Sequence, residues 1–179
     1  MIDLGIWLPV FGGWLRNVDD EGMPPTFAYN RKVAQAADAA GFSTMLIAEL
    51  NLNDINGPSH PALECWTTAS ALAPVTDDIR IMAAIRPGFR EPAVTAKMAS
   101  NIDHISDGRF EINLASPRPA AAIKTYAGYL SAPDSRSDPS VFFVLIFTAP
   151  CLPDRCPFAR DFSTIDATIL PPNPVQSGG

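Results

Sequence analysis

The strongest constraint on the fold is a regular alternation of two kinds of segment before residue 117. Short runs of branched and aromatic residues alternate with longer segments whose apolar residues recur every three or four positions. The short runs are typical of buried parallel strands and the longer segments of amphipathic helices. The expected strands are 2–10, 43–50, 79–85 and 109–116. The expected helices are 25–42, 60–75 and 91–106.

Strand and helix alternate with short connections, which predicts a parallel α/β sheet with right-handed crossovers. Two folds begin in this way. A doubly wound sheet usually has a glycine-rich phosphate loop after its first strand, but LPVFGGW does not match the pattern G-x-G-x-x-G. A (β/α)8 barrel begins with the same repeat and places its chemistry on the loops that follow the strands.

The alternation stops after Ser116. Of the 18 prolines in the chain, ten lie beyond that residue. The run VFFVLIF at 141–147 is strand-like and AAAIKTYAGYL is weakly helical, but the remaining stretches are polar and rich in proline, as in loops or disorder. We therefore expect an α/β domain over residues 1–116 and a divergent, loop-rich or disordered tail over 117–179.

Composition excludes several classes of function. The net charge of −6 comes without a basic stripe, which argues against nucleic acid as a partner. The N-terminus has no positively charged segment before its apolar residues, and VFFVLIF is far shorter than the roughly 20 residues that span a bilayer. A cytoplasmic protein with reduced cysteines is expected. No metal site is predicted, because His60 and His104 have no ligand at metal-binding spacing.

Four segments of the chain, taken in order, carry a resemblance to a known family. They are GIWLPVFGGWL, YNRKVAQAADAAGF, ECWTTASALAPVTDDIRIMAAIRPG and PAVTAKMASNIDHISDGRFEINL. Over residues 3–116 the chain resembles the bacterial luciferase-like, flavin-dependent monooxygenases, especially the alkanesulfonate, dimethylsulfone and pyrimidine-ring-opening branch. The resemblance implies a TIM barrel that binds reduced FMN supplied by a separate flavin reductase. It also implies the insertion of an oxygen atom from O2 into a small organic substrate.

The resemblance also implies site residues. Glu49 and Leu50, after the second expected strand, match the place where such enzymes contact the flavin ring, and Asn113 matches an asparagine that faces the ring. A buried strand amide needs a hydrogen-bond partner in any case. Trp14 and Arg86 are candidates for the substrate, as an aromatic wall and as an anion ligand. Each of these residues also has a purely structural alternative. Asn113 could be a core amide hydrogen-bonded within the protein, Glu49 a solvated carboxylate and Leu50 a packed side chain. Trp14 could anchor its loop, and Arg86 could form an ion pair.

The chain departs from the family after its fourth expected strand. Family members continue with Val-Thr-Gly or Val-Ser-Gly, whereas this chain reads Ala115-Ser116-Pro117-Arg118, and the later strands and phosphate loops have no counterpart in the tail. We therefore expect an incomplete barrel of four β/α units that is truncated and inactive as an oxygenase. Two alternatives remain open. One is a non-catalytic half-barrel that self-associates or pairs with a full-length relative, and the other is a deazaflavin-dependent oxidoreductase.

Overall fold

The structure, a computed structural model, describes most of the first 115 residues and a few residues of the tail. The described residues are 2–15, 17–18, 20–53, 55–86, 90–115, 158–160, 163–165 and 175. The chain divides into two compact units. The first comprises residues 1–85 and 109–115, and the second comprises residues 86–108 and 116–179.

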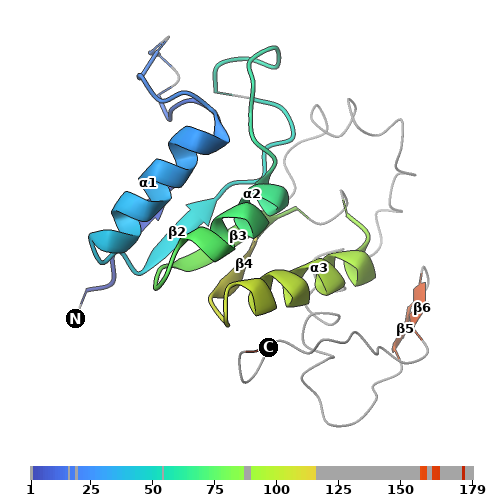
Figure 1. The fold of residues 1–179 in the computed structure, drawn as a ribbon. Helices are drawn as coiled ribbons and strands as arrows, with labels where there is room; N and C mark the ends of the chain where they lie inside the picture. The colour runs from blue at the N-terminus through green and yellow to red at the C-terminus, as the bar shows by residue number, and fades with distance from the viewer. Residues whose placement is uncertain are drawn as a thin grey trace. The chain divides into compact units, whose positions relative to one another are not determined.

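A four-stranded parallel sheet lies at the centre of the first unit, with its strands side by side in chain order (Figure 1). The predicted parallel α/β architecture is confirmed. The strands are β1 (Gly5–Trp7), β2 (Thr44–Ile47), β3 (Arg80–Ile85) and β4 (Phe110–Leu114). They are shorter than the predicted runs. In β1 the reason is Pro9, which has no N–H to continue the ladder beyond the bond from Leu8 N to Leu46 O.

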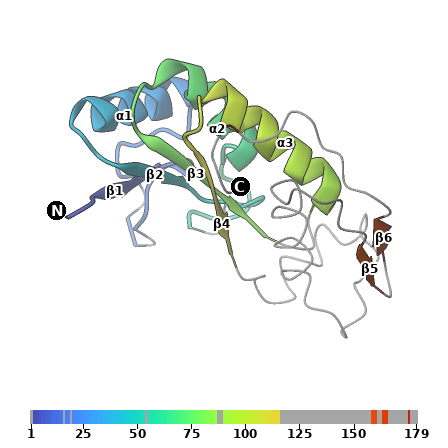
Figure 2. The ribbon, with the colours of Figure 1, turned by 90° about the horizontal axis from the view of Figure 1, so that it is seen from below.

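Two helices of the first unit cover one face of this sheet (Figure 2). The helix α1 spans Phe27–Ala39, and its cap Thr26 accepts a hydrogen bond from the backbone N–H of Tyr29. Its buried residues Asn30, Ala34 and Ala37 recur at helical spacing, which places them on one stripe against the sheet. The small side chains of this stripe allow the helix to approach the strands closely.

The helix α2 spans Cys65–Leu72 and is followed by the short 3-10 helix η1 (Ala73–Val75). The sequence predicted a helix from residue 60, with Pro61 in its first turn, and that start is wrong. The side chain of Glu64 accepts hydrogen bonds from the backbone N–H groups of Trp66 and Thr67, at 3.0 and 2.7 Å. These bonds satisfy donors that have no partner within a helix, so the helix begins after Glu64.

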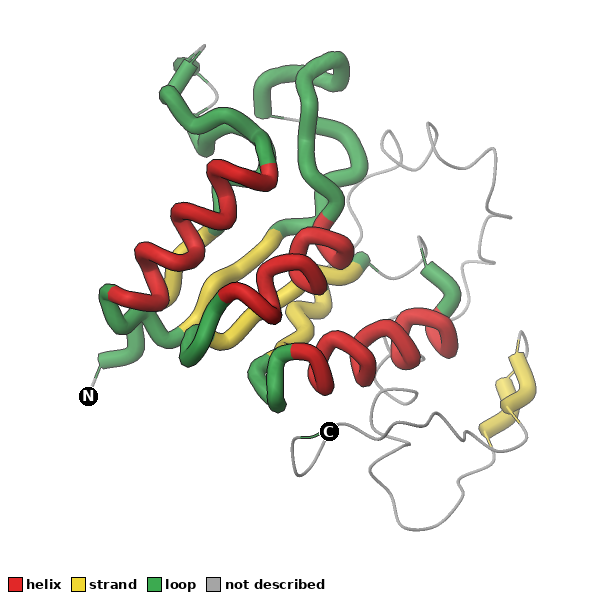
Figure 3. The backbone as a smooth tube through the Cα atoms, in the orientation of Figure 1, coloured by secondary structure: helices red, strands yellow, loops and turns green. Residues whose placement is uncertain are grey.

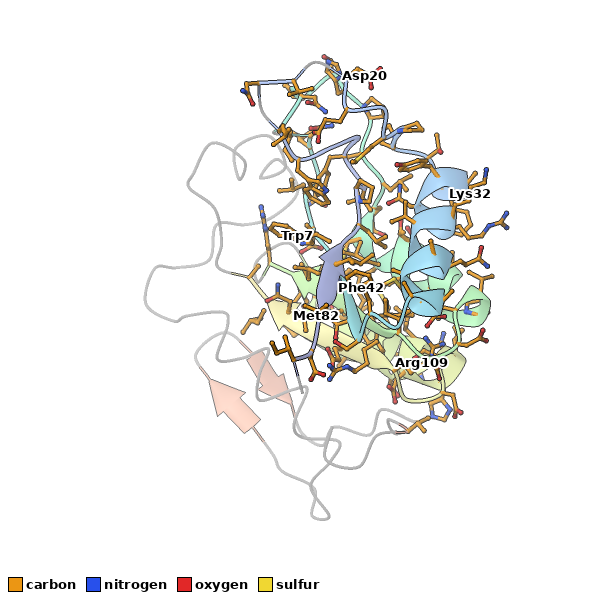
Figure 4. The ribbon with its side chains drawn as sticks, turned by 90° about the vertical axis from the view of Figure 1, so that its left-hand side faces the viewer. Trp7, Asp20, Lys32, Phe42, Met82 and Arg109 are labelled. Carbon is orange, nitrogen blue, oxygen red and sulfur yellow. The ribbon has the colours of Figure 1, made fainter. Side chains whose placement is uncertain are left out.

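The two faces of the sheet differ in burial. Side chains facing α1 and α2 are buried, among them Met45 and Ile81, and Phe110 packs edge-to-face on Trp66 of α2 at 5.4 Å. On the opposite face, the strand register aligns Trp7, Leu46, Met82 and Glu111 in one row. None of these four side chains is fully buried. Figure 4 shows Trp7 and Met82 on the side of the sheet away from α1, which carries Lys32.

The second unit contains the helix α3 (Pro92–Ile105), which begins with proline in its first turn as predicted. It ends before Asp107 and Gly108, which both adopt positive φ. Two short strands, β5 (Phe158–Arg160) and β6 (Ser163–Ile165), pair antiparallel (Figure 3), and the sequence did not predict them. The strand expected at 141–147 and the helix expected at AAAIKTYAGYL lie outside the described residues. Within the described ranges, no helix combines the length and apolar character needed to cross a membrane.

A polar hub ties the helices of the first unit to the start of β3 and β4. The Asp38 carboxylate, on α1, accepts from the backbone N–H groups of Asp77, Asp78 and Ile79 at 2.6, 3.1 and 2.8 Å. The guanidinium of Arg109, just before β4, donates to the carbonyl oxygens of Ala73, Thr76 and Ile79 and to the Thr76 hydroxyl. The hub lies at the amino ends of the strands and therefore stabilises the edge opposite the one where ligands bind in such sheets.

Replacing Asp38 by asparagine is expected to lower the free energy of unfolding by about 1 kcal/mol at neutral pH, because an amide has one acceptor oxygen instead of two. Burial alone would raise the pKa of Asp38, but its three backbone hydrogen bonds and the nearby Arg109 lower it below the ordinary value of 3.8. A lowered pKa in the folded state stabilises the fold above the unfolded pKa, and this stability is lost as the pH falls through the folded pKa.

Urea unfolding of the wild type and of Asp38→Asn across acidic and neutral pH measures this effect. The difference between the two proteins should shrink towards zero at acidic pH. Asp78→Asn is the matched control, because it removes a carboxylate from the same turn but keeps the backbone N–H that bonds to Asp38. An equal loss of stability in both variants would contradict the assignment to Asp38.

Candidate active site

The predicted site residues of the first unit lie at the carboxyl edge of the parallel sheet, where open α/β sheets and barrels bind ligands. Glu49 and Leu50 follow the last residue of β2, and Asn113 is the residue before the end of β4. Trp14 lies in the segment that follows β1. Arg86 directly follows β3 but opens the second unit, and its role as an anion ligand stays a prediction.

Asn113 projects from the sheet face that α1 and α2 do not cover. It pairs with Ala84 in the ladder, and it lies three residues from Phe110, which faces Trp66 of α2. Because successive side chains of a strand alternate between faces, Asn113 points to the face opposite Phe110. It is half-buried there. An amide in this position can donate and accept hydrogen bonds to a ligand at the strand end.

Glu49 is buried at the same edge. Only 2% of its surface is exposed, so the structural alternative of a solvated carboxylate at the end of the strand is wrong. Leu50 beside it is half-buried. A buried carboxylate is costly unless it is hydrogen-bonded or paired, so Glu49 needs polar partners at this edge of the sheet. Contact of Glu49 and Leu50 with a flavin stays a prediction.

An aromatic cluster lies at the end of β1. The ring of Trp14 stacks on Trp7, with centroids 5.1 Å apart and planes 12° from parallel. Phe11 meets Trp14 edge-on at 5.7 Å. Trp7 remains 55% exposed, and the register places it on the same sheet face as Asn113. The stack therefore presents a flat apolar surface on the same sheet face as Asn113, which lies three strands away on β4.

Asn53 holds the two loops that follow β1 and β2, and sequence reasoning missed it. Its Nδ2 donates to the carbonyl oxygens of Phe11 and Pro61 at 2.8 and 3.0 Å, and its Oδ1 accepts from the backbone N–H groups of Ile55 and Asn56. It is 1% exposed. In the sequence it lies in the polar stretch NLNDING, which is typical of a solvated turn, so no local signal marks its burial.

Parallel β/α units with polar and aromatic side chains at their carboxyl edge define a class of α/β proteins that bind small ligands at that edge. Within this class, the family described as luciferase-like monooxygenase matches residues 3–140, and the chain belongs to it. The resemblance seen in the sequence is thereby confirmed. The match continues beyond the motifs that carry that resemblance, which end in β4.

Curated relatives support the same family. The chain is 37% identical over 117 residues to the pyrimidine monooxygenase RutA of Pseudomonas savastanoi pv. phaseolicola. The alignment covers 63% of this chain and 32% of the relative. The chain thus spans about a third of the length of the curated relatives that it matches.

Solved structures share the fold. One is the oxygenating constituent of 3,6-diketocamphane monooxygenase of Pseudomonas putida in complex with FMN, with a TM-score of 0.66 and 18% identity over 93% of this chain and 44% of that chain. Another is an F420-dependent secondary alcohol dehydrogenase in complex with an F420-acetone adduct, with a TM-score of 0.69 and 17% identity over 96% and 49%. At such identities the likeness shows the fold alone.

Proposed function

We propose that this chain supplies the ring-binding part of a flavin-dependent monooxygenase, which transfers an oxygen atom from O2 to a small organic substrate. The observation that carries the proposal is the position of Asn113, whose side chain projects, at the carboxyl edge, from the sheet face that α1 and α2 do not cover. The stacked Trp7 and Trp14 provide an exposed aromatic surface on the same face. Membership of the luciferase-like monooxygenases supports this chemistry.

The residues present fit the ring system of a flavin. One edge of an isoalloxazine ring carries hydrogen-bond donors and acceptors in alternation, and an amide such as that of Asn113 can serve both. The rest of the ring is apolar and aromatic, which suits the side chains of Leu46 and Met82 in the same row as Trp7. The arginines at positions 80 and 109 lie at the amino ends of β3 and β4, so neither is placed to hold the phosphate of a flavin at the carboxyl edge.

We propose reduced FMN as the cofactor, delivered by a separate flavin reductase. When bound, it supplies the electrons that activate O2. The protein's own residues bind and orient the ring and keep water from it. Asn113 and the pair Glu49 and Leu50 are proposed to hold the ring, while Trp14 and Arg86 are proposed to contact the substrate.

The proposed fold goes beyond the parallel sheet that the structure shows. We propose that residues 1–116 correspond to the first four β/α units of a barrel and that 117–179 form a divergent tail. The solved relatives support only the partial-barrel component of this proposal, because the chain spans 44% and 49% of them. Such a chain would have two unpaired sheet edges, which proteins normally cover, and full oxygenase activity would require the residues that complete the barrel.

Replacing Asn113 by alanine is expected to weaken FMN binding about tenfold, because the loss of one or two hydrogen bonds to the ring corresponds to about 1.4 kcal/mol. Titration of the full chain with FMN, followed by flavin fluorescence, measures the dissociation constant. Asn101→Ala is the control, because this asparagine is exposed on α3. Equal affinity of Asn113→Ala and wild type for FMN would overturn the role of Asn113, and a wild type that binds F420 but not FMN would favour the deazaflavin alternative.

A second candidate function is a non-catalytic half-barrel that assembles with another copy. The observation in its favour is the apolar edge of the sheet at β1, where Ile2 is 85% and Leu4 61% exposed. Sedimentation of the same FMN titration samples separates the two candidates. A monomer that binds FMN supports the oxygenase proposal. An obligate dimer without affinity for FMN, converted to monomer by Leu4→Lys, supports the second candidate.

A further inference from the structure

The loop after β1 folds back on itself through a single carboxylate. The Glu21 Oε1 atom accepts a hydrogen bond from the backbone N–H of Leu15 at 2.8 Å and another from that of Trp14. Six and seven residues separate these donors from Glu21. Hydrogen bonds to an ionised carboxylate are stronger than those between neutral groups, so Glu21 fixes the backbone at Trp14.

Gly13 allows this close approach. A side chain at position 13 would collide with the carboxylate of Glu21. The backbone of Gly13 also has φ +135°, which residues with a side chain rarely adopt. Gly13 is itself buried. The loop therefore depends on the absence of a side chain at position 13 and on the carboxylate that occupies the space.

The position of Trp14 matters because its ring forms half of the aromatic stack at the end of β1. The ring lies nearly parallel to Trp7 and edge-on to Phe11, so a shift of the backbone at residue 14 would disturb both contacts. Leu15 and Asn17 of the same loop are exposed, so their side chains add little to hold it in place. Figure 4 shows the labelled Asp20 on this loop and Trp7 below it at the end of β1.

The neighbouring acid offers a direct contrast. The Oδ1 atom of Asp20 accepts from the backbone N–H of Gly22 at 2.7 Å, which closes a local turn and does not reach Trp14. Both acids lie in the same acidic stretch, DDE, where a sequence pattern predicts only solvated charges. The geometry therefore distinguishes two adjacent carboxylates that the sequence does not.

We propose that Glu21 is a positioning residue, which holds Trp14 stacked on Trp7 and thereby sets the aromatic wall of the site. The wall would receive the flat face of a ring, either that of the flavin or that of a planar substrate. The part of the proposal that concerns the ligand rests on the proposed function. The part that concerns the stack does not, because it holds for the chain without any ligand.

The stack can be followed directly by circular dichroism. Two stacked indole rings couple their electronic transitions and give a pair of bands of opposite sign in the far ultraviolet. Trp7→Phe should abolish this pair and so assign it to the stack. Glu21→Ala is expected to remove most of the intensity of this band pair. Glu21→Gln should retain part of it, because an amide oxygen still accepts hydrogen bonds, and Asp20→Asn should leave it unchanged. Gly13→Ala should reduce it as well, because the new methyl group displaces the carboxylate.

FMN titration of the same variants tests the consequence for the site. If the wall receives the flavin ring, Glu21→Ala should weaken FMN binding by about fivefold, and if it receives a planar substrate, FMN binding should stay unchanged. Asp20→Asn should leave FMN binding unchanged in both cases. An unchanged band pair in both Glu21→Ala and Gly13→Ala would overturn the positioning role, and so would an equal loss in Asp20→Asn. If the band pair responds as expected and the wild type does not bind FMN, the proposed function fails while the role of Glu21 in the stack stands.

Discussion

Replacing Trp66 by alanine is expected to lower the free energy of unfolding by about 4 kcal/mol, a larger loss than we expect from Asp38→Asn or Asn53→Ala. Trp66 is fully buried between α2 and the sheet, where it packs edge-on against Phe110. Its Nε1 donates to the carbonyl oxygen of Ala84 at 3.0 Å. The substitution leaves a cavity and removes a hydrogen bond to the carbonyl oxygen of Ala84. Ala84 is the residue that pairs with Asn113 in the sheet.

Urea unfolding of the full chain, followed by circular dichroism, measures this loss. Trp66→Phe separates the two contributions, because it keeps most of the packing and removes only the N–H donor. We expect it to cost about half as much as the alanine variant. A loss of less than about 1 kcal/mol for Trp66→Ala would contradict the view that α2 is anchored to the sheet through this side chain.

Asn53→Ala is expected to lower the free energy of unfolding by about 3 kcal/mol, because its side-chain hydrogen bonds to both loops disappear. The carbonyl oxygen of Phe11, which lies in a buried residue, loses the shorter of its two bonds to asparagine side chains. The loops after β1 and β2 are then no longer joined through this amide. We also expect weaker FMN binding, because these loops carry Trp14 and Glu49.

Asn56→Ala is the matched control for Asn53. Its Nδ2 donates to the same Phe11 carbonyl, but at 3.3 Å, so its removal should cost less than about 1 kcal/mol. Denaturant titration of both variants gives the comparison. An equal loss of unfolding free energy in the two variants would show that Asn53 acts as an ordinary loop residue and does not join the two loops.

Much of the first unit could be predicted from local patterns. The order of strands and helices follows from residues that are close in sequence, because the spacing of apolar residues distinguishes the two kinds of element. The boundaries were less predictable. The start of α2 depends on the Glu64 side chain, which competes with the proline at position 61 for the role of helix start, and only the observed hydrogen bonds decide between them.

The candidate site was predictable in part. The family resemblance indicated Glu49, Leu50 and Asn113 by their positions after or within strands, and the register then gave the direction of the Asn113 side chain. Asn53 and Glu21 carried no such signal. Polar residues in loops have similar local patterns whether they are solvated or buried, and their partners are backbone groups that any sequence provides.

By itself, the sequence determined the parallel β/α order and the family, because these depend on periodicity and on motifs read along the chain. Only the tertiary structure decided which carboxylate of DDE reaches Trp14, that Trp7 and Trp14 stack, and that Asn53 joins two loops. The physical reason is that these contacts join side chains and backbone groups from different segments. Their geometry is set only when the sheet brings those segments together.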